Sequence, residues 1–176
     1  TREKQRFLQY LSYKCNTFTE DVESSVFGKA MMDLFLESYS LEELSQMSLD
    51  DLADYLRVKG RNRFPDPEHV AKSIQRAVRS SYRLDKVVED SIDTIIGTSI
   101  TLIRAFEKQI KELDKSIKRI MKGVPQTLQT IPGMGPVFTA GIISEIGQID
   151  RFKDESKIAK YAGLYWRKHQ SGRFTA

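Results

Sequence analysis

Apolar residues recur at steps of three and four along nearly the whole chain, which is the spacing of amphipathic helices. In the first segment, this repeat predicts a helix that ends near Asn16, with its apolar face formed by Phe7, Leu8, Leu11 and Cys15. Nothing in residues 1–60 alternates between apolar and polar positions as a half-buried strand would. The pattern therefore predicts an all-α fold.

Shorter helices are expected between this first helix and residue 84. Ser40 and Ser48 each precede an acidic residue by three positions, so we expect both serines to cap short helices. Pro67 follows Asp66 and suits the first position of another helix. Residues 59–66 hold Gly60, Asn62 and Pro65 among arginines and predict an exposed loop. Two further helices are predicted over residues 19–27 and 30–39.

Residues 84–124 have the pattern of one long coiled-coil helix. Its seam positions follow alternating steps of four and three and are Ile92, Ile96, Ser99, Ile103, Phe106, Ile110, Leu113, Ile117, Ile120 and Val124. At ~1.5 Å per residue, such a helix is about 60 Å long, which exceeds what a small domain covers. We expect part of the seam to pack on a partner chain in a homo-oligomer; the alternative is packing against the chain's own N-terminal helices.

Composition fits a folded, soluble protein. Of the 176 residues, 40% are apolar and 30% are charged, with only 5 prolines and 10 glycines. No apolar run approaches the ~20 residues that span a bilayer, and no signal-peptide pattern is present, so we expect a cytoplasmic protein. Cys15 is the single cysteine, and with only His69 and His169 beside it no zinc site is expected.

Charge is divided unevenly between the two halves. Residues 1–100 carry a net charge of −3 and residues 101–176 carry +7. Nucleic acid is the natural partner for the basic half, because each phosphate that is neutralised releases condensed counterions. A basic surface that serves only solubility is the alternative.

The most specific local motif is LQTIPGMGPVFTAGIISEIG, residues 128–147. A helix is expected to stop near Thr130, a tight turn to follow at Gly133 and Gly135, and Pro136 to begin a second helix. The small residues Ala140 and Gly141 are expected to let the second helix pack closely against the preceding one. This is the helix-hairpin-helix pattern, in which glycines let the backbone approach a phosphate that the N–H groups of the second helix then bind. Such a motif binds the duplex backbone without reading bases. A plain corner in an all-α core is the alternative, since Ile142, Ile143 and Ile146 look buried.

Positive residues surround a serine near the C-terminal end. Ser171 and Gly172 are expected in a loop whose positive residues are Arg167, Lys168, His169 and Arg173. This serine can be a phosphate ligand or a nucleophile, but a hydroxyl needs a base or a metal to attack. From the residues alone, a simple turn is the favoured interpretation of Ser171, and His169 is interpreted first as a phosphate or turn contact.

The run TIPGMGPVFTAGIISEIGQIDRFKDESKIAKYAGLYWRKHQSG resembles the C-terminal domain of insertion-sequence transposases of the 110 family. The upstream order is similar as well: an arginine-containing helix (TREKQRFLQYL), a helical stretch (FLESYSLEELSQMSLDDLADYL), a coiled coil and then the hairpin. The resemblance therefore spans nearly the whole chain.

The resemblance implies a chemistry that the residues alone do not. Family members carry an N-terminal resolvase-like domain of the RNase H fold, whose four acidic residues hold a divalent metal such as Mg²⁺. Ser171 takes the position of the family's catalytic serine, which attacks a DNA phosphodiester and forms a covalent phosphoserine link. The residues that would then contact nucleic acid are the hairpin glycines Gly133 and Gly135 together with Arg167, Lys168, His169 and Arg173. The family also uses a noncoding guide RNA, which would be a second partner.

The chain departs from the family pattern because the four metal-binding acidic residues are absent. Three nearby acidic residues are not assigned to a metal and are interpreted as charges at a helix N-terminus, namely Asp50, Asp51 and Asp54. We therefore expect an internal fragment of a DNA transposase, inactive alone and without a metal site of its own. Its expected parts are a helical linker region over 1–83 that follows an absent RNase-H-fold domain, a coiled-coil helix over 84–124, and a truncated helix-hairpin-helix transposase domain over 125–176. The alternative function is a non-catalytic coiled-coil oligomerisation and nucleic-acid-binding module.

Overall fold

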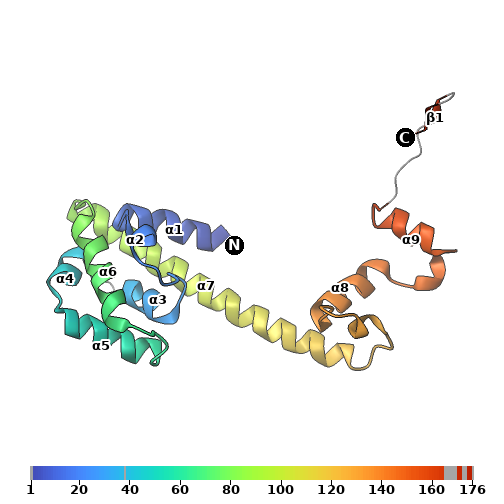
Figure 1. Ribbon diagram of the computed structural model, residues 1–176, viewed down its shortest axis with the longest axis horizontal. Helices are drawn as coiled ribbons and strands as arrows, with labels where there is room; N and C mark the ends of the chain where they lie inside the picture. Colours follow the sequence, from blue (N-terminus) through green and yellow to red (C-terminus); the bar gives the residue numbers. More distant parts are fainter. Residues whose placement is uncertain (1, 38, 165–169, 172–173, 176) are drawn as a thin grey trace. The chain divides into compact units, whose positions relative to one another are not determined.

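The computed structural model describes residues 2–37, 39–164, 170–171 and 174–175. Its α-helices are α1 (Arg2–Lys14), α2 (Phe18–Asp21), α3 (Lys29–Leu36), α4 (Leu41–Gln46), α5 (Leu49–Gly60), α6 (Pro67–Ser80), α7 (Lys86–Met121), α8 (Pro136–Ile146) and α9 (Glu155–Tyr161) (Figure 1). Short 3₁₀ turns η1 (Leu128–Thr130) and η2 (Ile149–Arg151) flank α8, and two-residue strands β1 (Gln170–Ser171) and β2 (Phe174–Thr175) pair antiparallel. The all-α prediction is confirmed, with this small strand pair as its one addition among the described residues.

The predicted helix starts are mostly correct because they rest on local hydrogen bonds. Ser40 forms a full capping box with Glu43, and the Ser48 hydroxyl accepts a hydrogen bond from the Asp51 amide. The Asp66 carboxylate accepts one from the His69 amide, directly before Pro67.

One predicted helix is shorter than expected. The helix expected over residues 19–27 ends at Asp21 as α2, and Val26 and Phe27 lie outside it. Ser24 and Ser25 precede these residues, and serine competes with a helix by offering the backbone other hydrogen bonds.

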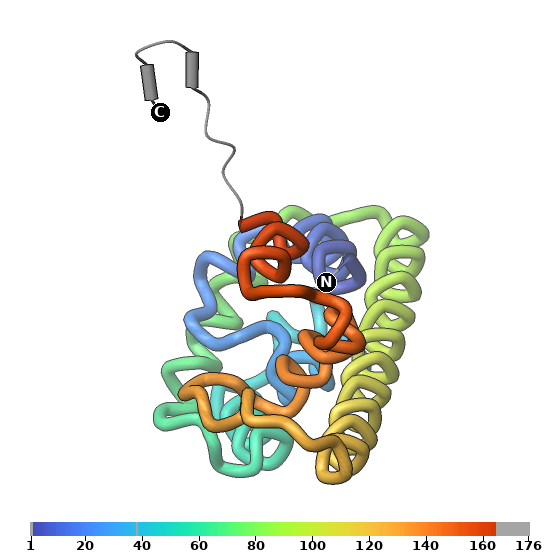
Figure 2. The backbone as a smooth tube through the Cα atoms, turned by 90° about the vertical axis from the view of Figure 1, so that its right-hand side faces the viewer, coloured from blue at the N-terminus to red at the C-terminus, as the bar shows by residue number. Residues whose placement is uncertain are grey.

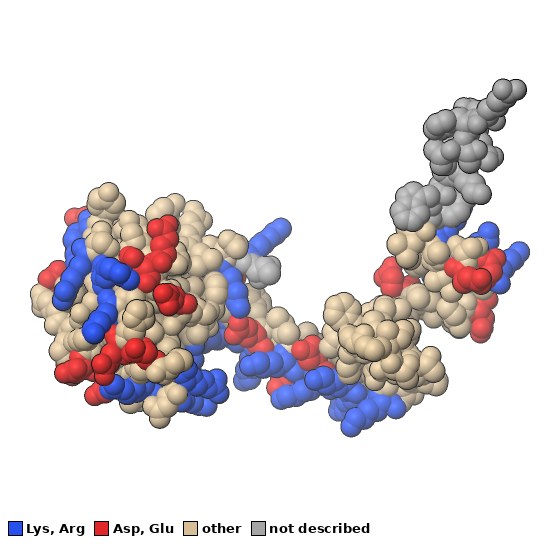
Figure 3. All heavy atoms as spheres, viewed as in Figure 1, with Lys and Arg blue, Asp and Glu red and all other residues tan. Residues whose placement is uncertain are grey.

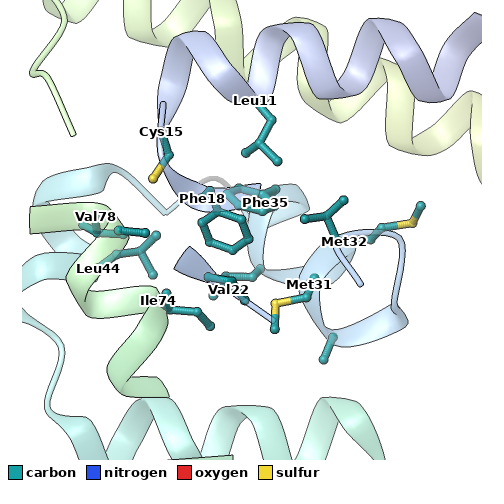
Figure 4. Close-up of a cluster of buried hydrophobic side chains, with 14 of the residues drawn as sticks. Leu11, Cys15, Phe18, Val22, Met31, Met32, Phe35, Leu44, Ile74 and Val78 are labelled. Carbon is teal, nitrogen blue, oxygen red and sulfur yellow. The ribbon is translucent and has the colours of Figure 1, made fainter. Parts of the chain in front are cut away.

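The chain divides into two compact units, residues 1–109 and residues 110–176, and α7 contributes to both. The first unit holds a continuous apolar core, which Figure 4 shows around Phe18 and Phe35. The two rings meet edge to face with their centres 4.9 Å apart. Leu11 of α1 and Ile74 of α6 close the same core and are fully buried.

The N-terminal half of α7 packs on this core. Four isoleucines of this half are less than 8% exposed, namely Ile92, Ile96, Ile100 and Ile103. Helix α1 lies antiparallel beside this half of α7 (Figures 1 and 2), since Lys14 pairs with Asp93 at 2.5 Å and Lys4 with Glu107 at 2.8 Å. The first part of the seam therefore packs on the chain's own helices, which was the alternative to a partner chain.

Much of the rest of the seam is left exposed by the described residues, although Ile117 and Val124 are half-buried. Phe106 is 49% exposed, Ile110 56%, and Leu113 and Ile120 63% each. In residues 110–164, only the side chains of Met121 and Thr139 are buried. The second unit therefore has little core of its own among its described residues.

Candidate nucleic-acid interface

The hairpin of the second unit is built around a left-handed glycine. Gly133 has a φ of +87°, a conformation that side chains with a Cβ rarely adopt. The Met134 amide donates to the Ile131 carbonyl at 3.0 Å, and the Gly135 amide donates to the Gly133 carbonyl at 3.2 Å. These bonds close a tight turn between η1 and α8, as the sequence predicts.

Gly135 caps α8 without a side chain, and Pro136 occupies the first helical position. The first backbone amides of a helix have no hydrogen-bond partner within the helix. No side chain caps the start of α8, so the amides of Val137 and Phe138 are available to an anion. A Cβ built on Gly133 or Gly135 meets no atom within 4 Å. An approaching phosphate would therefore find both glycines accessible.

Three details of the hairpin differ from the sequence prediction. The element before the turn is the three-residue 3₁₀ turn η1 in place of a regular helix. Ile142, Ile143 and Ile146 are half-buried, not buried, because little of the second unit packs over them. Gly141 does not serve close packing, since a Cβ there would meet nothing within 4 Å.

The hairpin carries almost no charge. In residues 123–149, Glu145 is the only charged residue. Figure 3 shows this part as tan spheres, whereas Lys and Arg line one edge of the C-terminal half of α7. Lys111, Lys115, Lys118 and Lys122 are spaced four, three and four apart and so share one face of α7 and its end. The attraction to a polyanion must therefore come from residues that flank the hairpin.

A second group of basic residues surrounds α9. They line a hollow of about 470 Å³, whose residues are Arg151, Phe152, Lys153, Lys157, Lys160 and Tyr161. The Arg151 guanidinium carbon lies 4.7 Å from the centre of the Phe152 ring and 4.9 Å from that of Tyr161. The two aromatic rings thus hold an arginine in place at the edge of the hollow.

Local hydrogen bonds fix the position of this basic group. Asp154 caps α9 by accepting from the Lys157 amide at 3.1 Å, and hydrogen bonds from Ser156 and from that amide lower the pKa of its carboxyl. The Tyr161 hydroxyl donates to the Glu145 carbonyl at 3.3 Å and so connects α9 to α8.

This basic group was not among the residues predicted from the sequence. The spacing of Lys153, Lys157 and Lys160, at steps of four and three, was the signal that could have found it.

Ser171 lies in strand β1, where its backbone pairs with that of Phe174 in β2. The loop expected at this serine is thus a strand end at residue 171. Arg167, Lys168, His169 and Arg173 lie outside the described residues. The structure therefore neither groups these four residues around Ser171 nor separates them from it.

The residues described here do not form a metal site. No group of three or more His, Cys, Asp or Glu side chains among them is arranged to hold a metal ion. The resemblance assigns the divalent metal to a separate domain, and no residue of this chain is given a metal role. None of the described helices is long and apolar enough to span a membrane.

Comparison with known protein families matches the C-terminal part of the chain. Residues 125–176 match the Transposase IS116/IS110/IS902 family. No curated protein and no solved structure matches the chain significantly. The matched segment begins just before η1 and includes the hairpin, the basic group around α9 and Ser171.

Proposed function

We propose that the chain is part of a DNA recombinase that acts in insertion-sequence transposition, because residues 125–176 match the Transposase IS116/IS110/IS902 family. The observation that carries the proposal is that one matched segment holds an open glycine hairpin, a basic hollow and Ser171. The proposed reaction cuts and rejoins DNA through a covalent serine–phosphodiester intermediate.

In this proposal the hairpin and the basic group around α9 both contact DNA, each through different groups. The amides at the start of α8 bind a backbone phosphate, and the glycines let it come close. Arg151 and the lysines around α9 supply the positive charge that the hairpin lacks. Such contacts position a duplex and carry no base information.

The chemical step uses the Ser171 hydroxyl as the nucleophile. Its oxygen forms a bond to the phosphorus, the bond from phosphorus to one sugar oxygen breaks, and that sugar leaves as a hydroxyl after taking up a proton. The new phosphoserine ester preserves the bond energy, so a second DNA end can reverse the step without ATP. A serine hydroxyl needs a general base or a metal to lose its proton, and the family resemblance assigns this task to a domain outside residues 1–176. Arg167, Lys168 and Arg173 are proposed to offset charge on the phosphorus, with His169 as a phosphate contact.

Two parts of the proposal concern further partners. The exposed seam from Phe106 to Ile120 is proposed to pair with a second copy of the chain. A guide RNA is proposed from the family resemblance and from the net positive charge of residues 101–176.

The alternative function is a binding module in which Ser171 is only a strand residue. The exposed seam and the basic hollow favour this alternative as much as they favour the recombinase, because neither requires catalysis.

A strand-exchange assay separates the two functions. Ser171→Ala in the complete transposase should abolish strand exchange while nucleic-acid binding stays within about twofold of the parent. Ser144→Ala is the matched control, because this exposed hydroxyl of α8 donates only to the Gly141 carbonyl, at 2.9 Å. Strand exchange that survives Ser171→Ala would establish the binding module instead.

A further inference from the structure

A second basic pocket lies in the N-terminal unit, away from the sequence that matches the transposase family. It has a volume of about 290 Å³ and lies where the start of α3 meets the connection between α5 and α6. Four cationic side chains line it, namely Lys29, Lys59, Arg61 and Arg63. No acidic residue is among its lining residues, which otherwise are Gly28, Ala30, Gly60 and Phe64.

The four cations differ in how they are paired. Lys29 lies 2.5 Å from Asp33, and Lys59 pairs with Glu37. Arg61 and Arg63 are exposed and form no ion pair with any residue that the structure describes. Two guanidinium groups at this pocket are therefore available to an external anion, and guanidinium is well suited to phosphate.

The loop places Arg61 at a conformational cost. Arg61 has a φ of 53° and Asn62 a φ of 54°, the left-handed region in which glycine is the favoured residue. The neighbouring Gly60 is required for another purpose, since a Cβ there would come within 2.5 Å of the Phe64 ring. That ring packs against the core and fixes the loop to the rest of the unit.

We propose that this pocket binds a phosphodiester of a nucleic-acid backbone, with Arg61 and Arg63 as its ligands. The N-terminal unit then supplies a nucleic-acid contact of its own, in addition to the hairpin of the second unit. The choice of nucleic acid over other polyanions rests on the proposed function, whereas the pocket itself does not depend on Ser171 or on the hairpin.

The test uses the whole chain and a duplex of about 30 base pairs, in two unrelated sequences. Arg61→Gly combined with Arg63→Gln should weaken binding of both sequences about tenfold at ~0.1 M salt. The slope of log affinity against log salt should become shallower by about one to two units, because each lost phosphate contact contributes ~0.9. Glycine at position 61 suits the left-handed backbone, so the melting temperature should stay equal or rise.

The matched control removes the same charge elsewhere in the unit. Lys72→Gln with Arg79→Gln changes two exposed cations of α6 that do not line the pocket. It should weaken binding less than twofold. An equal loss in both double variants would mean that net charge alone matters and would overturn the proposal.

Two further results keep this pocket distinct from its alternatives. Inorganic phosphate is added alone at millimolar concentration and constant ionic strength. It should neither shift the amide resonances of residues 61–63 nor displace the duplex. A shift of these resonances without displacement of the duplex would assign the pocket to free phosphate. The pocket is rejected, and the hairpin remains the binding site, if the pocket variant binds the duplex normally while the Gly135→Ala variant binds it weakly. The hairpin alone is rejected if the pocket variant binds weakly and the Gly135→Ala variant binds normally. A parent chain that binds no nucleic acid would overturn both the pocket and the hairpin as binding sites.

Discussion

At the scale of single residues, the N-terminal unit depends on buried charges that a sequence pattern does not show. Lys14 is only 1% exposed, yet it pairs with Asp93 and donates to the Tyr39 carbonyl at 3.0 Å. Asp33 is 7% exposed and lies 2.5 Å from both Lys29 and Arg104. These pairs join α1 and α3 to α7 within the N-terminal unit.

Asp33 should make folding stability depend on pH. Burial alone would raise its pKa, but hydrogen bonds from Lys29 and Arg104 outweigh burial and lower the pKa below its ordinary value. A lowered pKa in the folded state means that the unfolded state binds the proton more tightly. Asp33 therefore stabilises the fold above its unfolded pKa of about 4, and this contribution is lost as pH falls through the folded pKa.

Asp33→Asn should lower the free energy of unfolding by about 1–2 kcal/mol at pH 7, because two charge-assisted hydrogen bonds are weakened. Urea unfolding at a series of pH values measures this. The gap between the variant and the parent should close as pH approaches 2. A gap that stays constant with pH would show that the Asp33 carboxylate is not the titrating group.

At the scale of elements, the hairpin allows a test without backbone strain. Gly135 has a φ of −74°, which alanine adopts freely, so Gly135→Ala adds a methyl group where a phosphate would approach. We expect duplex binding about tenfold weaker for every sequence tried, measured by fluorescence anisotropy. Gly141→Ala, also in open space but within α8, should leave binding unchanged. A loss confined to one DNA sequence would contradict backbone binding.

Helix α7 carries one seam in two environments, and the same substitution made in each environment tests them separately. Ile96 is fully buried and Ile110 is 56% exposed, although they lie two heptads apart on the same seam. Ile96→Asp should unfold the N-terminal unit, since a buried unpaired charge costs several kcal/mol. Ile110→Asp should leave the circular dichroism spectrum intact and shift the sedimenting species toward monomer. An unchanged mass would exclude the seam as an oligomer contact.

Local sequence signals predicted helix starts well and long-range packing poorly. Ser40, Ser48 and Asp66 act through bonds to residues three positions away, so the sequence contains nearly all of the relevant information. The packing of α7 depends on residues about eighty positions upstream, such as Lys14, which pairs with Asp93, and periodicity does not specify it. The contact of Arg151 with the Tyr161 ring crosses the turn before α9, so helical periodicity does not specify it either.

At the scale of the whole molecule, the two units differ in what holds them together. Residues 1–109 have a continuous apolar core, whereas the described part of residues 110–176 leaves Ile131, Phe138, Ile149 and Leu164 more than half exposed. Sequence analysis placed a transposase domain over 125–176, and the family match covers those residues. The catalytic role of Ser171 stays a proposal, because it depends on chemistry with DNA.

Trapping of the covalent intermediate tests that role most directly. The complete transposase is mixed with end-labelled DNA, denatured and separated on a gel, and the labelled protein band is digested to locate the modified residue. The account predicts a phosphodiester link at Ser171 that disappears in Ser171→Ala and persists in Ser144→Ala. A labelled adduct of undiminished intensity in Ser171→Ala would contradict it.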